Sequence, residues 1–263
     1  MNGEMDMMKT GAEIIVEVLI EQGVDVVFGY PGGTVINIYD ALFQNRNRIR
    51  HILTAHEQGA SHAADGYARA TGKTGVVIAT SGPGATNIVT GIATAYMDSI
   101  PMVAITGNVT TDAMGRDSFQ EVYIAGVTLP ITKHNFLVKK IEDLASTLRE
   151  AFRIAQSGRP GPVLVDVPKD LTIASYEFEN KEVIKPQHHV PVKEEDIKYL
   201  AELINKSTRP VIYFGGGVIS SEASNELSEL INTCSIPACH TLMATGVLSY
   251  GDRLNLGMVG MHG

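Results

Sequence analysis

Cysteine is scarce in this chain of 263 residues, and the two cysteines present do not form a metal-binding pattern. They are Cys234 and Cys239, with His240 next to the second. A structural zinc site needs four ligands, usually in tighter pairs, so we expect two buried, reduced thiols and no metal ligand. His56 and His62 are six positions apart, whereas the helical motif of zinc metalloproteases places its two histidines four apart. That kind of site is excluded as well.

A basic surface and a long apolar run are also missing. Lysine and arginine total 21 against 29 aspartates and glutamates, a formal net charge of -8, which argues against nucleic-acid binding. No run of about 18 apolar residues occurs, so no membrane span is predicted. Residues 1–9 show neither the apolar core of a signal peptide nor the arginine-rich pattern of a transit peptide. We therefore expect a cytoplasmic protein.

Apolar runs alternate with helical patterns along most of the chain, which predicts a doubly wound α/β fold with a parallel sheet. Thr10 and Thr34 stand where they are expected to cap the first two helices. The expected strands are residues 24–28, 52–54, 75–80, 101–106 and 162–167, and the expected helices are residues 10–22, 34–43, 57–71, 86–98 and 141–156.

The pattern changes after residue 172. Residues 173–194 are irregular and carry several charges and two prolines, which is typical of a linker. A second α/β pattern follows, with two helices and two strands. The sequence therefore predicts a first domain of residues 1–172, a linker of residues 173–194 and a Rossmann-like second domain of residues 195–263. About 70 residues is short for a self-sufficient doubly wound unit.

Glu57 stands at the first turn of an expected helix, directly after a short strand. Glycine-rich turns precede and follow it, at residues 30–33 and 81–87, and each turn joins a strand to a helix. A carboxylate beside such turns is placed to meet a ligand at the strand ends of an α/β sheet. The alternative is a first-turn glutamate that only interacts with the helix dipole. Small residues fill the helix after Glu57, so its start is expected to be partly buried, a setting that suits proton exchange.

Together these segments resemble the pyrimidine-binding part of thiamine diphosphate enzymes, and most closely that of acetolactate (acetohydroxyacid) synthase catalytic subunits. In that family a glutamate at the place of Glu57 hydrogen-bonds the aminopyrimidine of the coenzyme, which promotes loss of the thiazolium C2 proton. The resemblance implies that thiamine diphosphate also lies near Tyr30, Pro31, Gly32, Gly33, Pro83 and Asn87.

The run Phe119-Gln120-Glu121 narrows the resemblance to the biosynthetic acetolactate synthases. There the glutamine lies beside the coenzyme and the first pyruvate, so the resemblance makes Gln120 the second catalytic residue after Glu57, with Phe119 shaping the substrate pocket. It also implies that Arg159 contacts a flavin nucleotide and that Lys169 lines the channel to the active site. Without the family, these residues would be an ordinary polar loop and two surface charges.

Three consecutive glycines, Gly215, Gly216 and Gly217, follow an expected strand and precede a helix. This pattern alone is weak evidence for a dinucleotide site, because a tight strand-to-helix turn looks the same. In the family such a turn contacts FAD, which is largely structural there. The resemblance implies further FAD contacts at Thr241, Leu242, Met261 and His262.

The resemblance also implies parts that this sequence does not contain. Complete family members bind the diphosphate through Mg²⁺ in a further domain with a Gly-Asp-Gly signature, and no Gly-Asp-Gly occurs here. We therefore expect an N-terminal part of a catalytic subunit, inactive by itself. The complete protein is expected to be a homodimer that acts on 2-oxo acids in branched-chain amino acid biosynthesis. A small regulatory subunit is a further partner in many such enzymes.

Two alternatives stay open. One is another thiamine diphosphate enzyme of 2-oxo acids, such as pyruvate oxidase, which uses its flavin for redox chemistry. Glyoxylate carboligase lacks the glutamate, so Glu57 argues against it. The other is a non-catalytic nucleotide-binding homologue. The choice of acceptor between pyruvate and 2-oxobutyrate, and feedback regulation, are not encoded in these residues.

Overall fold

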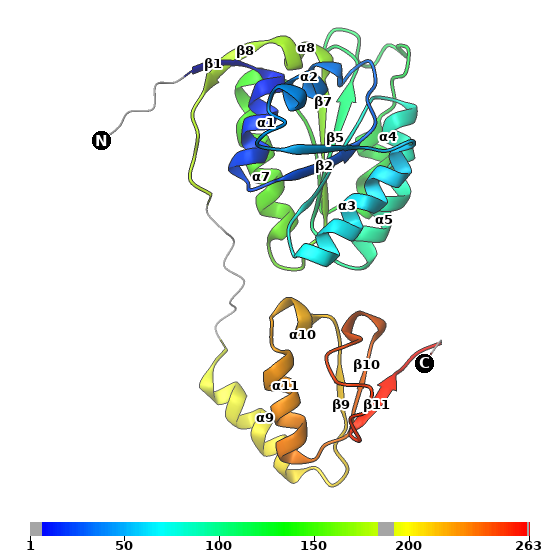
Figure 1. The fold of residues 1–263 in the computed structure, drawn as a ribbon, viewed down its shortest axis with the longest axis vertical. Coiled ribbons are helices and arrows are strands. Elements are labelled where there is room, and N and C mark those ends of the chain that lie inside the picture. Colours follow the sequence, from blue (N-terminus) through cyan, green and yellow to red (C-terminus); the bar gives the residue numbers. More distant parts are fainter. Residues whose placement is uncertain (1–6, 184–191, 262) are drawn as a thin grey trace, which may run out of the picture. The chain divides into compact units, whose positions relative to one another are not determined.

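The computed structural model describes residues 7–183, 192–261 and 263, and the chain forms two compact units, residues 1–188 and 189–263 (Figure 1). The first unit is built on a parallel sheet of six strands in the order β3-β2-β4-β5-β7-β6. Its strands are β2 (Val26–Gly29), β3 (Arg50–Leu53), β4 (Gly75–Ala79), β5 (Met102–Asn108), β6 (His134–Leu137) and β7 (Pro162–Pro168). The predicted α/β class with a parallel sheet is thus confirmed.

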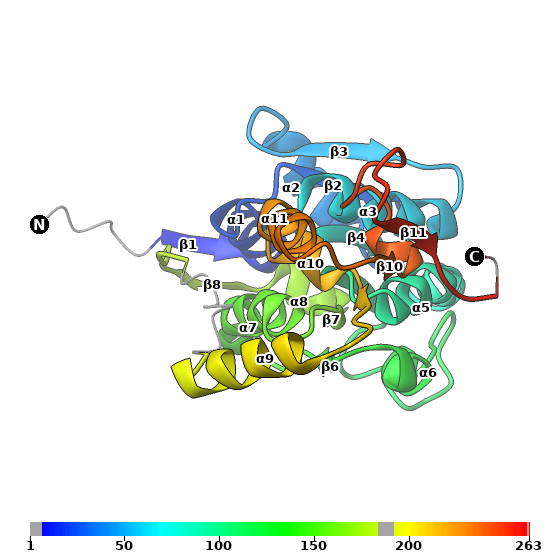
Figure 2. The same ribbon diagram turned by 90° about the horizontal axis from the view of Figure 1, so that it is seen from below.

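Helices cover both faces of this sheet (Figure 2). On one face lie α1 (Gly11–Glu21), α2 (Ile36–Gln44), α7 (Leu144–Gln156) and α8 (Lys169–Ile173), and on the other lie α3 (Glu57–Thr71), α4 (Pro83–Asn87), α5 (Val89–Met97) and α6 (Ile124–Thr128). Short 3-10 turns, η1 (Leu129–Ile131) and η2 (Ile141–Asp143), precede β6 and α7.

The central strands are buried on both faces, which explains their continuous apolar runs. In β5, Val103 and Ile105 pack toward α1 and α7, while Met102 and Ala104 pack toward α3 and α5. Successive side chains on a strand point to opposite faces, so one strand serves two cores. Burying a valine, isoleucine or methionine side chain contributes about 1.5 to 3 kcal/mol.

Two helix ends form as the sequence predicts. Thr10 caps α1 in a capping box: the Glu13 amide donates to Thr10 Oγ1 (3.3 Å), and the Thr10 amide donates to Glu13 Oε2 (2.7 Å). Helix α3 begins at Glu57 and ends at Thr71. Gly72 follows it with φ +71°, a left-handed conformation that favours glycine.

Thr34 is not the cap of α2, so that prediction is wrong. The helix begins at Ile36, and the residue before it makes no side-chain cap. Thr34 instead forms a hydrogen bond with Thr80, on the loop after β4, as described below. The predicted helix of residues 86–98 is also different, because it forms as α4 and α5 with a break at Ile88.

Part of the expected linker is a strand. Residues Ser175–Phe178 form β8, which pairs antiparallel with β1 (Met7–Thr10), a strand that the sequence did not predict. Phe178 is buried in the core of the first unit, and the cationic groups of Lys9 and Arg149 lie over its ring. The residues next to Phe178 in the sequence are charged, and for this reason the sequence predicts a linker here. Residues 184–191 of that expected linker lie outside the described residues.

The second unit has a parallel sheet in the order β11-β10-β9. Its elements are β9 (Ile212–Phe214), β10 (Ala238–His240), β11 (Asn255–Met258), α9 (Glu194–Lys206), α10 (Gly217–Ser220), α11 (Ser224–Cys234) and η3 (Leu242–Ala244). A small core gathers around Phe214, Ile231 and Ala238. Cys234 is exposed and Cys239 is half-buried, so the expectation of two buried thiols is wrong. No described helix in either unit is long and apolar enough to cross a membrane.

Candidate active site

Loops from several strands meet at the carboxyl edge of the six-stranded sheet, because all its strands are parallel. The loop after β2 is joined to the loop after β4 by hydrogen bonds. Thr34 Oγ1 lies 2.9 Å from Thr80 Oγ1, and the Ser81 amide donates to Thr34 Oγ1 at 3.0 Å. A Cβ on Gly32 would lie 2.4 Å from the Thr80 Cβ. A side chain at position 32 would therefore force these two loops apart.

Glu57 is buried at this edge, with 8% of its surface exposed. Asn87 Nδ2 donates to Glu57 Oε2 at 3.0 Å, and no hydrogen bond to Oε1 occurs within the described residues. Gly84 leaves room beside Oε1, since a Cβ there would lie 3.2 Å from that oxygen. Burial raises the pKa of Tyr39, and the negative charge of Glu57 raises it further. Asn87 thus fixes one oxygen of the Glu57 carboxylate, and the other, Oε1, can accept a hydrogen bond from a ligand.

The contact between Gly82 and Gln120 brings the loop after β5 to the same edge of the sheet as Glu57. Gly82 has φ +60° and ψ -116°, and a Cβ there would lie 2.6 Å from the Gln120 carbonyl oxygen. Gln120 itself has φ +60°, which is uncommon for a residue with a side chain. Its side chain is exposed, as is that of Phe119 (88%). Two of the contacts at this edge thus join predicted residues to their surroundings: Asn87 bonds Glu57, and the backbone of Gln120 packs on Gly82, next to Pro83 in the sequence.

The remaining predicted residues of the first unit divide between the two edges of the sheet. Tyr30, 42% exposed, follows β2, and exposed Lys169 follows β7, both at the carboxyl edge. Arg159 lies before β7, at the opposite edge, where its guanidinium donates to Ser99 Oγ (2.5 Å) and to the Met97 carbonyl (3.2 Å). The structure does not bring Arg159 to Glu57.

In the second unit, the glycine turn after β9 lies beside the segment that follows β10. The Thr241 amide donates to the Phe214 carbonyl at 3.0 Å, and a Cβ on Gly216 would lie 3.0 Å from the Met243 Cβ. Leu242 and Met261 are 70% and 91% exposed. His262 lies outside the described residues.

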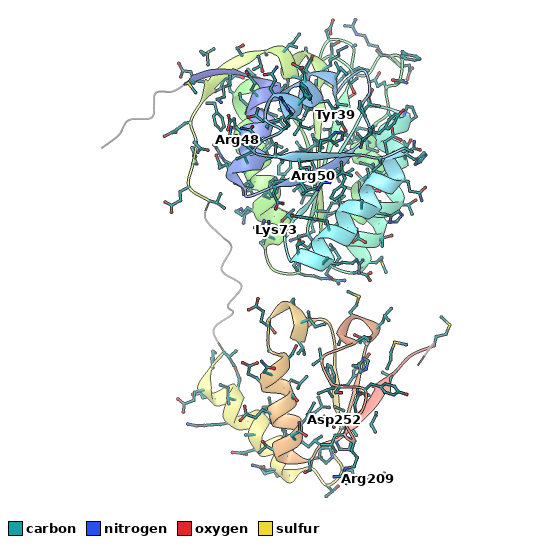
Figure 3. The ribbon with its side chains drawn as sticks, in the orientation of Figure 1. Tyr39, Arg48, Arg50, Lys73, Arg209 and Asp252 are labelled. Atoms are coloured by element: carbon teal, nitrogen blue, oxygen red, sulfur yellow. The ribbon has the colours of Figure 1, made fainter. Side chains whose placement is uncertain are left out.

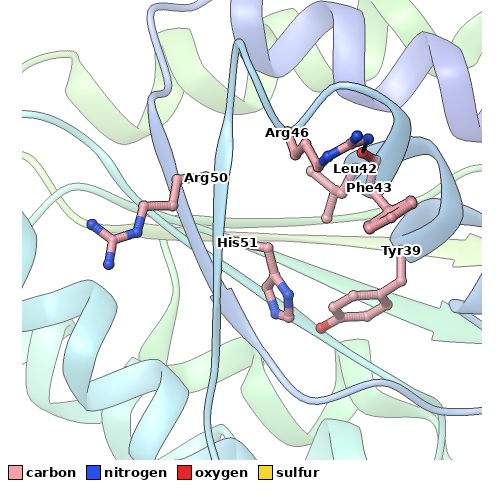
Figure 4. Close-up of a pocket in the computed structure, with 6 residues that line it drawn as sticks. All are labelled: Tyr39, Leu42, Phe43, Arg46, Arg50 and His51. Carbon is pink, nitrogen blue, oxygen red and sulfur yellow. Dashed lines mark hydrogen bonds between the residues drawn. The ribbon is translucent and has the colours of Figure 1, made fainter.

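A shallow cavity of about 230 Å³ lies between α2 and β3, and none of the residues predicted for the site lines it. In Figure 4, Tyr39 and His51 face each other, while the Arg50 side chain points away from them. The rings of Tyr39 and His51 meet edge to face with centroids 4.8 Å apart, and Tyr39 Oη donates to the Ile78 carbonyl at 3.0 Å. Figure 3 places Tyr39 and Arg50 in the first unit, together with Arg48, which forms an ion pair with Glu17. These contacts are those of a packed sheet edge.

Two family models match the chain. Residues 9–127 match the N-terminal thiamine pyrophosphate (thiamine diphosphate) binding domain of thiamine pyrophosphate enzymes, and residues 197–263 match the central domain of the same enzymes. The chain belongs to this family. The first unit accordingly carries its coenzyme-binding domain, at whose strand ends Glu57 and the glycine turns lie.

Known acetolactate synthases resemble the chain along nearly its whole length. It is 51% identical to the acetolactate synthase of Mycobacterium bovis over 97% of this chain and 41% of that protein. The acetolactate synthase isozyme 1 large subunit of Escherichia coli is 51% identical, over 97% of this chain and 45% of that protein. The probable acetolactate synthase large subunit of Methanocaldococcus jannaschii is 50% identical, over 96% and 44%. The chain thus spans less than half the length of these curated relatives.

The residues at the carboxyl edge fit the coenzyme of this family. The Ser81 hydroxyl is buried without a hydrogen-bond partner in the described part of the chain, so it can serve a ligand. Glu57 offers an acceptor oxygen, and Gly32, Gly82 and Gly84 leave the backbone open to close approach. Among the described residues, no group of three or more His, Cys, Asp or Glu side chains lies close enough to hold a metal ion.

Several residues that organise the carboxyl edge of the sheet were not predicted from the sequence. Thr34 and Thr80 are 46 positions apart, and a pair of threonines gives no sequence signal. The Glu121 carboxylate accepts from the Gly115 amide and from the Ser118 amide (2.9 Å), which closes the loop that carries Gln120. The only available signal was the adjacency of Glu121 to the predicted glutamine.

Changing Asn87 to alanine is expected to lower kcat of the complete enzyme about 10-fold, because Glu57 loses the donor that fixes its orientation. Asn87→Asp should be more harmful still, since a second carboxylate would then face Glu57 at hydrogen-bond distance. Steady-state kinetics with saturating coenzyme measures both effects. Thr90→Ala, at an exposed threonine on the next helix, is the matched control. Equal kcat in Asn87→Ala and the control would contradict this role.

A buried carboxylate joins β5 and β7 near the same edge. Thr106 Oγ1 (2.7 Å) and Asn108 Nδ2 (2.6 Å) donate to the two oxygens of Asp166, which is 3% exposed. Burial raises the pKa of Asp166 to about 7, although both hydrogen bonds act in the opposite direction. The folded protein therefore holds a proton here that the unfolded chain has released above about pH 4.

The free energy of unfolding is accordingly expected to fall as pH rises from about 4 to 7, by up to about 1.4 kcal/mol per pH unit from Asp166. Asp166→Asn should remove this part of the slope, because its amide does not titrate. Urea unfolding at several pH values measures the difference between variant and parent. Asp143→Asn, an exposed and unpaired aspartate within the described residues, should keep the parent's slope. The same slope in Asp166→Asn would contradict the assignment.

Proposed function

We propose that the complete protein is a thiamine diphosphate-dependent acetolactate synthase. It would decarboxylate one pyruvate and join the remaining two-carbon unit to a second 2-oxo acid, as in branched-chain amino acid biosynthesis. The observation that carries the proposal is the buried Glu57 carboxylate, held by Asn87 between two glycine-rich turns. The similarity to acetolactate synthases, which covers 96–97% of this chain, supports the proposal further.

When bound, thiamine diphosphate supplies a thiazolium that stabilises the negative charge left by decarboxylation. Glu57 Oε1 would hold a proton on the coenzyme's aminopyrimidine ring, which makes Glu57 the residue that promotes loss of the C2 proton. Asn87 would keep the second oxygen of Glu57 occupied and so fix the carboxylate plane. The burial of Glu57 excludes water from this contact.

Gln120 and Phe119 would contact the substrate from the loop after β5. Their side chains are exposed, and the backbone of Gln120 packs on Gly82, whose conformation favours glycine and lets the loop approach. Lys169, exposed after β7 at the same edge, would line the approach of the 2-oxo acid. A cationic side chain there suits an anionic substrate.

Further parts of the proposal concern FAD, Mg²⁺ and partners. FAD would contact Arg159 of the first unit, and in the second unit the glycine turn at residues 215–217 with Thr241, Leu242, Met261 and His262. Mg²⁺ would bind the diphosphate through residues outside this sequence. We also propose a cytoplasmic homodimer, with a small regulatory subunit as a further partner, and that this chain alone does not turn over.

An assay of the complete gene product tests the function. Incubation with pyruvate, Mg²⁺ and FAD should yield acetolactate only when thiamine diphosphate is added. Acetyl phosphate or acetate formed with reduction of an electron acceptor, and no acetolactate, would instead identify a pyruvate oxidase. Nucleotide binding without thiamine diphosphate binding would identify a non-catalytic homologue. Either result would overturn the proposal.

A further inference from the structure

The loop that carries Gln120 is long and partly exposed. It runs from residue 109, after β5, to residue 123, before α6, and contains no regular helix or strand. Two of its residues other than glycine, Asp117 (φ +52°) and Gln120 (φ +60°), have left-handed backbones. Such conformations cost about 1–3 kcal/mol each and persist only where neighbouring groups hold them.

At its far end the loop is closed on itself. The Glu121 carboxylate accepts from the amides of Gly115 and Ser118, and Ser118 Oγ donates to the Ala113 carbonyl at 2.7 Å. These bonds are internal to the loop. They fix its shape, and they do not fix its place on the sheet.

Two carboxylates outside the loop fix its base. Asp166, on β7, orients Asn108, whose Oδ1 in turn accepts from the Val109 amide at 2.8 Å. Asp170, in the first turn of α8, accepts from the Thr111 amide (3.0 Å) and from Thr111 Oγ1 (2.6 Å). Thr111 thus gives two donors to a single side chain, and a carboxylate is a strong acceptor for both.

We propose that Asp170 is a positioning residue that, through its paired hydrogen bonds to Thr111, holds residues 109–123 so that Gln120 packs on Gly82 beside Glu57. The functional consequence rests on the proposed carboligase activity, in which Gln120 contacts the substrate. Asp170 follows Lys169 directly, so α8 presents the substrate-approach residue and the loop's anchor from adjacent positions.

The test uses the complete enzyme and compares Asp170→Asn with Asp143→Asn, which makes the same change of charge at an exposed aspartate. An amide at position 170 keeps one oxygen to accept from the Thr111 amide, but its NH2 group cannot accept from the Thr111 hydroxyl, so the bond from that hydroxyl to a carboxylate is lost and at most a weaker neutral bond replaces it. We expect hydrogen exchange of the backbone amides in residues 109–123 to be about 10-fold faster in Asp170→Asn. The kcat for acetolactate should fall by a similar factor, with an unchanged unfolding midpoint for the rest of the protein.

Variants of Thr111 separate positioning from general stability. Thr111→Val removes the hydroxyl at nearly constant volume and should reproduce the effects of Asp170→Asn, whereas Thr111→Ser should retain the parent's kcat. The double variant Asp170→Asn/Thr111→Val should be no worse than the worse single one, because both remove the same contact.

Exchange of the loop amides is measured whether or not the enzyme turns over. Exchange in Asp170→Asn and Thr111→Val equal to that in Asp143→Asn overturns the proposal even if acetolactate is formed. Faster loop exchange in an enzyme that forms no acetolactate retains the anchoring by Asp170 and rejects the proposed function. Faster exchange with the kcat of the parent rejects the positioning role.

Discussion

Replacing Glu57 by glutamine is expected to lower acetolactate formation by the complete enzyme about 100- to 1000-fold while the fold stays intact. The amide has the shape of the carboxylate and its oxygen still accepts from Asn87, so packing at the start of α3 changes little. A neutral amide does not hold a proton on the coenzyme's pyrimidine ring as a carboxylate does. Steady-state kinetics at saturating thiamine diphosphate measures the loss, and circular dichroism measures the fold.

Glu142→Gln is the matched control, because Glu142 is exposed and belongs to no part of the site. It should keep the activity of the parent. If Glu57→Gln keeps it too, Glu57 has no part in proton transfer, and the mechanism given above is wrong.

Replacing Gly82 by alanine should both destabilise the protein and nearly abolish activity. The backbone at φ +60° and ψ -116° is strained for any residue with a Cβ, and that Cβ would lie 2.6 Å from the Gln120 carbonyl oxygen. Either the turn shifts toward Glu57 or the loop with Gln120 moves away. We expect a loss of about 2–4 kcal/mol in the free energy of unfolding, and at least a 100-fold loss of kcat.

Gly23→Ala separates the effect of backbone strain from the effect of the close contact with Gln120. Gly23 also has a positive φ (+75°), but a Cβ there would meet no atom within 4 Å. Its replacement should cost about 1 kcal/mol of backbone strain and leave kcat unchanged. Gly82→Ala with the same small effect would mean that the close packing of Gly82 on Gln120 is unimportant.

The sheet and its flanking helices could be predicted because their signals are local. Continuous β-branched runs marked β4, β5 and β7, and a cap or a terminal glycine marked the ends of α1 and α3. Short strands with weak patterns were missed, β1 and β8 among them, since each is stabilised mainly by pairing with the other.

The parallel sheet also explains how much of the site could be foreseen. Parallel strands end at one edge, so the turns near Glu57 had to lie close together in space. The contacts that fix their geometry join residues far apart in sequence and of ordinary type. Thr34 with Thr80 and Asp170 with Thr111 are such pairs, and only a three-dimensional structure reveals them.

Arg159 shows what a family resemblance does not predict, namely the contacts that a residue makes. The family resemblance made it a cofactor contact, and in this structure it lies at the amino edge of the sheet, bonded to Ser99 and Met97. The resemblance implied its role but not its surroundings. Its contact with FAD stays a prediction.

The most direct test of the account is the rate at which the C2 proton of thiamine diphosphate exchanges with solvent deuterium on the complete enzyme. NMR after acid quenching gives this rate without any substrate, so it isolates the contribution of Glu57. The account predicts exchange much faster than that of free coenzyme in the parent, and a loss of most of that acceleration in Glu57→Gln but not in Glu142→Gln. Equal rates in the parent and Glu57→Gln would contradict the central claim that this carboxylate activates the coenzyme.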